Sequence, residues 1–144
     1  MRDAFHDDLD SIEATLVEMA QLVNRAMERA TTALLTSDLK LAEEVISEDD
    51  RIDEMQHELD DKTLNVMARQ QPVARDLRTL VTSLRMSADL ERMGDLAHHI
   101  AKLARMRYPN CAVPEELRPA FKDMGAVANR IIDKVGKVID QHDS

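Results

Sequence analysis

Two pairs of acidic residues stand one helical turn apart in the middle of the chain. Asp49 and Asp53 form an Asp-x-x-x-Asp pair, and Glu91 and Asp95 form a Glu-x-x-x-Asp pair. On a helix, side chains at this spacing share one face, where like charges repel each other. A bound cation would relieve the repulsion, and carboxylate oxygens suit Mg²⁺, iron or Zn²⁺. The four carboxylates are therefore candidate metal ligands.

The two pairs are placed symmetrically about a predicted turn. Pro72 disfavours helix at Gln71 and suits the first turn of a following helix, so the chain is expected to reverse direction here. Positions 49 and 95, like positions 53 and 91, are equally far from this turn along the chain. In an antiparallel helix pair both carboxylate pairs are then expected at the same height.

Other residues near these carboxylates each admit two interpretations. His57 and His98 lie within four residues of an aspartate and are either nitrogen ligands or surface histidines. Gly94 interrupts a predicted helix, where it costs about 1 kcal/mol relative to alanine. It makes room either for an ion or for a closely packed helix. The carboxylates themselves could be an ordinary solvated helix surface, because the chain contains 28 acidic residues.

The composition predicts the scaffold that must position these groups. The chain has 144 residues, enough for one core, with 44% hydrophobic and 33% charged residues. Aromatic residues make up only 2%, and there are 3 glycines and 4 prolines. A β-sandwich or barrel needs frequent turn formers, so this composition argues against one. The fold class is predicted to be all-α.

Hydrophobic periodicity predicts three long helices. The first spans about residues 3–35, with a seam of alternating four- and three-residue spacings made by Phe5, Leu9, Ile12, Leu16, Met19, Val23, Ala26, Ala30 and Ala33. The second begins after the capping residues at 36–38, ends near Gln71, and turns inward Leu41, Val45, Ile52, Met55, Leu59 and Val66. The third runs from Pro72 to Arg107, with Val73, Leu77, Leu80, Leu84, Leu90, Met93, Ala97, Ile100 and Ala104 inward.

These segments predict an antiparallel three-helix bundle over residues 1–107. Residues 108–114 form a loop, and a fourth helix is expected over 115–144, with Phe121, Met124, Val127, Ile131, Val135 and Val138 on one side. The unfinished apolar face of this helix indicates a chain truncated just after a second unit begins. The alternative is an ordinary four-helix bundle.

Charge and cysteine content exclude several classes of protein. The net charge is −9, which argues against general nucleic-acid binding and against docking on an anionic membrane surface. Cys111 is the single cysteine, so it makes neither an intramolecular disulfide nor a thiolate metal site. No apolar run approaches the roughly 20 residues of a membrane span, and the first ten residues do not resemble a signal peptide. We expect a cytoplasmic protein without membrane insertion, and the unfinished face predicts a homodimer.

A row of arginines is a second candidate site. Arginines recur at spacings of three, seven and seven residues along one side of the third helix: Arg75, Arg78, Arg85 and Arg92. In an acidic protein such a row could recognise an acidic partner. The favoured interpretation is simpler: these arginines form ion pairs with Glu58 and with Asp60 or Asp61 on the neighbouring helix.

Several segments resemble the PhoU family, the accessory regulators of phosphate-specific transport. The resemblance rests on MRDAFHDDLDSIEATLVEMAQLVNRAMERA at the start, AEEVISEDDRID, ARQQPVARDLRTL and, above all, SADLERMGDLAHHIAKLA. It extends over essentially the whole chain. The run MRYPN further resembles the actinobacterial branch of the family.

The resemblance implies a fold, a cofactor and a role. Proteins of this family are two tandem three-helix repeats, so residues 115–144 would be the first helix of an incomplete second repeat. Their acidic x-x-x-Asp motifs bind multinuclear iron or zinc clusters and map onto Asp49, Asp53, Glu91 and Asp95. The resemblance further implies a negative regulator of the phosphate-starvation response. Such a regulator bridges the ATPase subunit of the phosphate transporter and a sensor histidine kinase without catalysing a reaction.

A carboxylate-bridged di-metal enzyme in a helical bundle is the alternative function. Such sites favour Glu-x-x-His motifs on two helices, and Glu54-x-x-His57 fits this pattern. The third helix offers Asp95-x-x-His98 instead, and the first helix provides no obvious inward glutamate. The sequence contains neither a glycine-rich phosphate loop nor a Gly-x-Ser-x-Gly motif nor a Cys-His constellation. These observations favour the adaptor over an enzyme.

Overall fold

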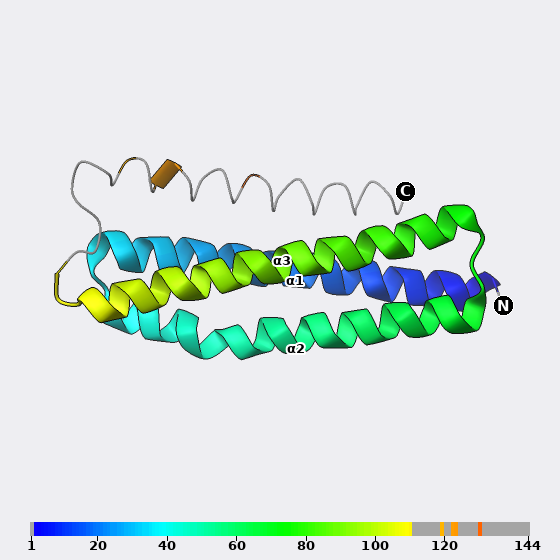
Figure 1. Ribbon diagram of the computed structural model, residues 1–144, viewed down its shortest axis with the longest axis horizontal. Helices are drawn as coiled ribbons and strands as arrows, with labels where there is room; N and C mark the ends of the chain where they lie inside the picture. The colour runs from blue at the N-terminus through cyan, green and yellow to red at the C-terminus, as the bar shows by residue number, and fades with distance from the viewer. Residues whose placement is uncertain (1, 111–118, 120–121, 124–129, 131–144) are drawn as a thin grey trace.

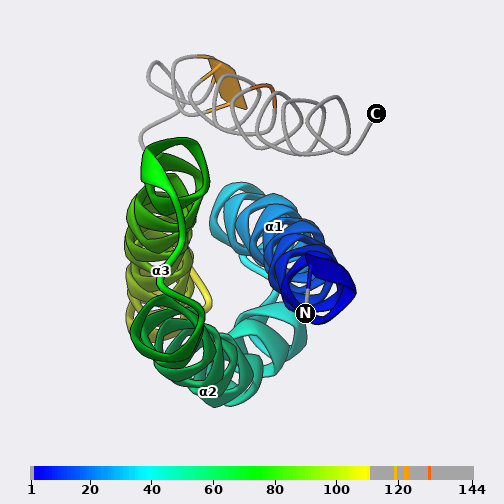
Figure 2. The same cartoon turned by 90° about the vertical axis from the view of Figure 1, so that its right-hand side faces the viewer.

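Three long helices form an elongated bundle. The computed structural model describes residues 2–110 and, beyond them, residues 119, 122, 123 and 130. The helices are α1 (Arg2–Thr36), α2 (Leu39–Gln70) and α3 (Ala74–Arg107). Successive helices run antiparallel, so α1 and α3 point in the same direction (Figure 1). The end-on view shows the three helices around one common core (Figure 2). The all-α three-helix bundle is therefore confirmed for the described range.

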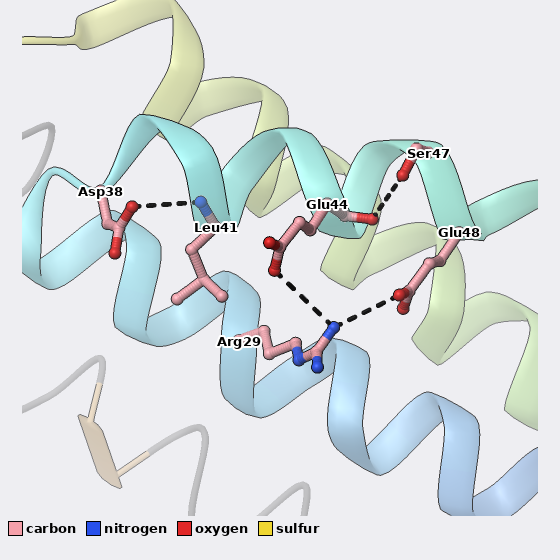
Figure 3. Close-up of polar contacts among 6 residues, drawn as sticks. All are labelled: Arg29, Asp38, Leu41, Glu44, Ser47 and Glu48. Carbon is pink, nitrogen blue, oxygen red and sulfur yellow. Dashed lines mark hydrogen bonds and ion pairs between the residues drawn. The ribbon is translucent and has the colours of Figure 1, made fainter.

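The connection from α1 to α2 is closed by local polar contacts. Asp38 is the N-cap of α2, and its side chain accepts a hydrogen bond of 3.1 Å from the backbone N–H of Leu41 (Figure 3). Arg29 of α1 lies between two glutamates of α2, 4.0 Å from Glu44 and 3.3 Å from Glu48. These ion pairs are substantially exposed, so each contributes less than about 1 kcal/mol. The association of the two helices therefore depends mainly on apolar packing.

The turn between α2 and α3 lies where the sequence predicts it. Gln71 ends α2 in the left-handed conformation, with φ of 45°. The prediction that Pro72 lies in the first turn of α3 is wrong, because Val73 is the extended N-cap residue and the helix begins at Ala74. Val73 also lacks a side-chain capping hydrogen bond. The carboxylate pairs on α2 and α3 nevertheless keep the predicted symmetric placement about this turn.

The seam of α1 is the best-predicted part of the core. Seven of the nine predicted positions, from Ile12 to Ala33, are buried, and Phe5 and Leu9 pack partly buried against the core. Alanines line the same end of α1 and α3, with Ala26, Ala30 and Ala33 on one helix and Ala97, Ala101 and Ala104 on the other. Small side chains at this end allow the two backbones to approach closely.

The seam of α3 differs from the prediction. The buried residues follow an alternating three- and four-residue spacing through Leu80, Ser83, Ser87, Leu90, Gly94, Ala97, Ala101 and Ala104. Val73 and Leu77, which we expected to face inward, are 68% and 40% exposed. Serines and a glycine occupy three of these buried positions. A line drawn through the large apolar residues alone is therefore displaced from the buried face of α3. The actual seam does not pass through Leu77.

The predicted fourth helix lies largely outside the described residues. Pro119, Lys122, Asp123 and Arg130 are described, and each of them is helical and exposed. The remainder of residues 111–144, with the predicted apolar positions from Phe121 to Val138, is outside the described range, as is Cys111. The second repeat therefore stays a prediction. None of the helices in the described range has a stretch long and apolar enough to cross a membrane.

Candidate metal centre

Three of the four predicted carboxylates come together between α2 and α3. Asp49, Asp53 and Asp95 each offer one oxygen atom that lies within 4.8 Å of the corresponding oxygens of the other two. Two ligands on opposite sides of a small cation are separated by about 4.2 Å, twice a metal–oxygen distance of about 2.1 Å. Small side-chain rotations would therefore let these oxygens share one ion. An all-oxygen donor set suits Mg²⁺ and the borderline ions iron and Zn²⁺.

Asp49 occupies a position that periodicity assigns to the core. The buried residues of α2 include Ala42, Val45, Ile52 and Met55, and position 49 continues the same alternating spacing between Val45 and Ile52. The side chain of Asp49 is only 15% exposed. Placing a carboxylate at such a position is costly unless it has a compensating partner. This break in the apolar seam is the sequence signal that distinguishes Asp49 from the many acidic residues on the surface.

Gly94 allows α3 to approach α2 beside the carboxylates. A Cβ atom added to Gly94 would lie 3.3 Å from Cγ2 and 3.5 Å from Cδ1 of Ile52, and 3.8 Å from Cγ2 of Val23. The residues facing this glycine are thus apolar core side chains. The structure supports the interpretation of Gly94 as a packing notch, and this notch is filled by Ile52, the residue before Asp53. Close packing here brings Asp95, next to Gly94, towards the aspartates of α2.

Glu91, the fourth predicted ligand, lies at the edge of this group and has a raised pKa. Burial raises its pKa from 4.5 to about 7, assisted by a hydrogen bond to the side chain of Asp95 and by the charges of Asp95, Asp53 and Asp49. A protonated Glu91 donates this hydrogen bond to the Asp95 carboxylate. In the absence of a metal ion, one proton therefore offsets part of the repulsion that a cation would remove entirely.

The two predicted histidine candidates lie in different environments. His98 places Nδ1 3.2 Å from Oδ2 of Asp49, and its side chain is 17% exposed. Burial raises the pKa of Asp49, the nearby His98 opposes that increase, and Asp53 and Asp95 add to it. His57 is exposed, as is Glu54, the other member of its Glu-x-x-His motif. Neither histidine belongs to the group of three carboxylates.

The predicted arginine row faces solvent. Arg75, Arg78, Arg85 and Arg92 are all exposed. The favoured prediction that they pair with Glu58, Asp60 or Asp61 is wrong for the described range, where the one ion pair of the row joins Arg92 to Asp89 of the same helix at 3.9 Å. The row lies on the side of α3 opposite its buried seam, beyond the reach of α2. Arg75, Arg78 and Arg85 thus present unpaired charge.

The proton on Glu91 leads to a prediction for the metal-free protein. Between the unfolded pKa of 4.5 and the folded pKa of about 7, the folded protein binds a proton that the unfolded chain lacks. The contribution of Glu91 to stability is therefore greatest below about pH 4.5 and is lost as the pH rises through 7. We expect Glu91→Gln to make the protein more stable than wild type at about pH 8 and to reduce the fall of Tm between about pH 5 and 8.

Thermal unfolding followed by circular dichroism in the presence of a chelator measures this difference. The exposed Glu58→Gln variant is the matched control, because it removes a carboxylate from α2 outside the group. We expect its Tm to follow the wild-type pH dependence. Parallel pH profiles for wild type and Glu91→Gln would contradict the assignment of the shared proton.

The sequence of this chain matches a known family and several known proteins. A family model described as the PhoU domain matches residues 16–104. The chain is 44% identical over 143 residues to the phosphate-specific transport system accessory protein PhoU homolog 2 of Mycobacterium tuberculosis, covering 99% of this chain and 67% of that protein. PhoU homolog 1 of Mycobacterium leprae is 41% identical and is covered to 64%. These mycobacterial matches agree with the resemblance to the actinobacterial branch.

Solved structures give the same result. The crystal structure of PhoU from Pseudomonas aeruginosa superposes with a TM-score of 0.80 at 28% identity, covering 90% of this chain and 61% of that chain. PhoU from Streptococcus pneumoniae, described as a phosphate transport system regulatory protein, gives a TM-score of 0.76 at 27% identity and is also covered to 61%. The chain thus spans about two thirds of the length of these relatives. By sequence and by fold, it belongs to the PhoU family.

Proposed function

We propose that this chain is an accessory protein of phosphate-specific transport that acts as a regulatory adaptor. The 44% identity over 99% of the chain to a protein of that name carries the proposal. In this role the chain restrains the phosphate-starvation response by bridging the cytoplasmic ATPase subunit of a phosphate transporter and a sensor histidine kinase. Its place of action would be the cytoplasm, where those partners are accessible. Homodimerisation and the absence of nucleic-acid binding stay predictions.

Within this proposal, the carboxylate group is a metal centre that stabilises or modulates the adaptor. Asp49, Asp53 and Asp95 would hold iron or zinc, or alternatively magnesium, and Glu91 would join them when its proton is displaced. The donor set fits such an ion because three oxygens from two helices already lie within 4.8 Å of one another. A bound cation would neutralise their charge and tie α2 to α3.

The arginine row is the proposed contact surface for a partner. Three exposed arginines without ion pairs, on a chain of net charge −9, form a local region of opposite sign. Such a region favours association with an acidic surface and orients the two proteins during encounter. Arg75, Arg78 and Arg85 lie at least six residues from Glu91 along α3, so a partner bound to these three arginines need not occlude the metal ligands.

The geometry favours an adaptor over the di-metal enzyme. The enzyme template requires inward Glu-x-x-His motifs, but Glu54 and His57 are both exposed. Glu13 of α1 is buried, contrary to the prediction that this helix has no inward glutamate, but among the described residues the group of mutually close donor atoms consists of Asp49, Asp53 and Asp95. The arrangement can hold a cation, which is sufficient for a structural or modulatory centre.

Direct binding to the ATPase subunit of the phosphate transporter of the same organism tests the proposal. Calorimetry would compare metal-free, iron-loaded and zinc-loaded chain, with a full-length relative as the positive control. We expect micromolar or tighter binding by this chain. If the full-length relative binds and this chain does not, the interface lies outside this chain. If neither binds, the adaptor proposal is wrong and the metalloenzyme becomes the leading hypothesis.

A further inference from the structure

His98 contacts the carboxylate group but is not one of its members. Its Nδ1 atom is 3.2 Å from Oδ2 of Asp49, but the set of mutually close donor atoms contains Asp49, Asp53 and Asp95 and not His98. The Nδ1 atom is fully buried and makes no aligned hydrogen bond to the described residues. A buried imidazole nitrogen beside a single carboxylate oxygen has one obvious acceptor, and that acceptor is Asp49.

A cavity beside Asp49 offers its carboxylate a second position. Asp49 lines this cavity of about 290 Å³ between α1 and α2, whose walls also include Arg25, Glu48 and Arg51 and whose inner end reaches Gly94. Arg25 of α1 and Arg51 of α2 attract a carboxylate, and the cavity has room for the rotated side chain. Asp49 therefore lies between two alternatives, one among the aspartates on the α3 side and one in the cavity on the α1 side. Repulsion from Asp53 and Asp95 favours rotation into the cavity.

We infer that His98 is a positioning residue for the metal centre, because its Nδ1–H holds the Asp49 carboxylate on the side of Asp53 and Asp95. The inference rests on the proposed metal site and adds a residue that acts through a ligand. With Oδ2 held by His98, Oδ1 is left for the cation. Donors that hydrogen-bond to a metal ligand in this way fix its orientation, and their loss typically lowers metal affinity by about 10- to 100-fold.

Zn²⁺ binding by the whole chain, measured in competition with a chromophoric chelator, tests this role. We expect His98→Ala to raise the dissociation constant by about 10- to 100-fold. Asparagine can place an amide N–H where the histidine has Nδ1, whereas glutamine reaches the position of Nε2. His98→Asn should therefore recover most of the affinity, and His98→Gln should not. The absorption spectrum of bound Co²⁺ should shift in His98→Ala and return towards wild type in His98→Asn.

His99→Ala is the matched control, because His99 is the adjacent, exposed histidine whose ring meets that of His98 edge to face at 6.3 Å. It should leave both measurements unchanged. Wild-type affinity in His98→Ala, with Asp49→Asn still weakened, would overturn the positioning role but keep the metal site. Equal losses in His98→Asn and His98→Ala would also overturn it, because the loss would then follow packing. If wild type binds no Zn²⁺ through Asp49, the proposed site and the inference are both wrong.

Discussion

Asp53→Asn combined with Asp95→Asn is expected to abolish metal binding while leaving the metal-free fold intact. The double variant removes two of the three carboxylates that lie within 4.8 Å of one another, one from each helix. Loss of a residue that hydrogen-bonds to a metal ligand typically costs about 10- to 100-fold in affinity, so loss of two direct ligands should cost of the order of 1,000-fold or more. The neutral amides also relieve like-charge repulsion, so the metal-free variant should be at least as stable as wild type.

Thermal unfolding with and without metal measures both effects. At a free metal concentration of about 100 times Kd, binding stabilises the folded wild type by about 2.7 kcal/mol, which corresponds to a rise in Tm of about 10 °C for a domain of this size. The double variant should show no rise at the same concentration. Glu58→Gln/Asp61→Asn is the control, because both residues are exposed on α2 and the charge change is the same. A wild-type shift retained in the Asp53/Asp95 variant would exclude this group as the metal centre.

The fold could be predicted from the sequence wherever large apolar side chains mark the seam. In α1 large apolar residues mark the seam from Ile12 to Val23, alanines continue it to Ala33, and the predicted positions are buried. In α3 the prediction fails because Ser83, Ser87 and Gly94 occupy seam positions that hydrophobicity does not reveal. A seam assigned from the alternating three- and four-residue spacing alone would include these three residues and exclude Leu77.

The candidate site was predictable in its placement but not in its detail. Symmetry about the turn near Pro72 correctly brings Asp49, Asp53 and Asp95 together, because two straight antiparallel helices preserve height. The raised pKa of Glu91 depends on its burial and on the nearby charges, neither of which is encoded in helical spacing. The contact of His98 with Asp49 likewise depends on the rotation of α3 about its axis, which Gly94 and Ile52 determine through packing.

For the arginine row, the predicted ion pairs with acidic residues on α2 are absent from the described part of the chain, because the geometry of α3 prevents them. Acidic residues on α2 were expected to pair with the row because α2 is the neighbouring helix. The row instead lies opposite the buried seam of α3, so its arginines point away from both packed helices. Three of them make no ion pair in the described part of the chain.

Reversing the charge of the three unpaired arginines in this row is expected to weaken partner binding about 100-fold without affecting metal binding. Arg75→Glu/Arg78→Glu/Arg85→Glu replaces the three exposed arginines of the row that make no ion pair in the described part of the chain. Each lost attraction and each new repulsion is worth about 0.5 kcal/mol at exposed positions, giving roughly 3 kcal/mol or a 100-fold loss of affinity for the ATPase subunit. Association should slow more than dissociation accelerates, because exposed charges act chiefly on the encounter.

A second triple variant on the same helix separates this surface from net charge. Lys102→Glu/Arg105→Glu/Arg107→Glu changes the charge of the chain equally, and all three residues are exposed near the end of α3. If the row is the contact surface, only the first variant loses binding, and raising the salt concentration weakens wild type towards it. Equal losses in both variants would mean that overall charge governs association. Unchanged binding in the first variant would place the partner on another face. Because the substituted positions are at least seven residues from Asp95 along α3, both variants should keep the wild-type metal affinity, which confirms that each protein tested is folded.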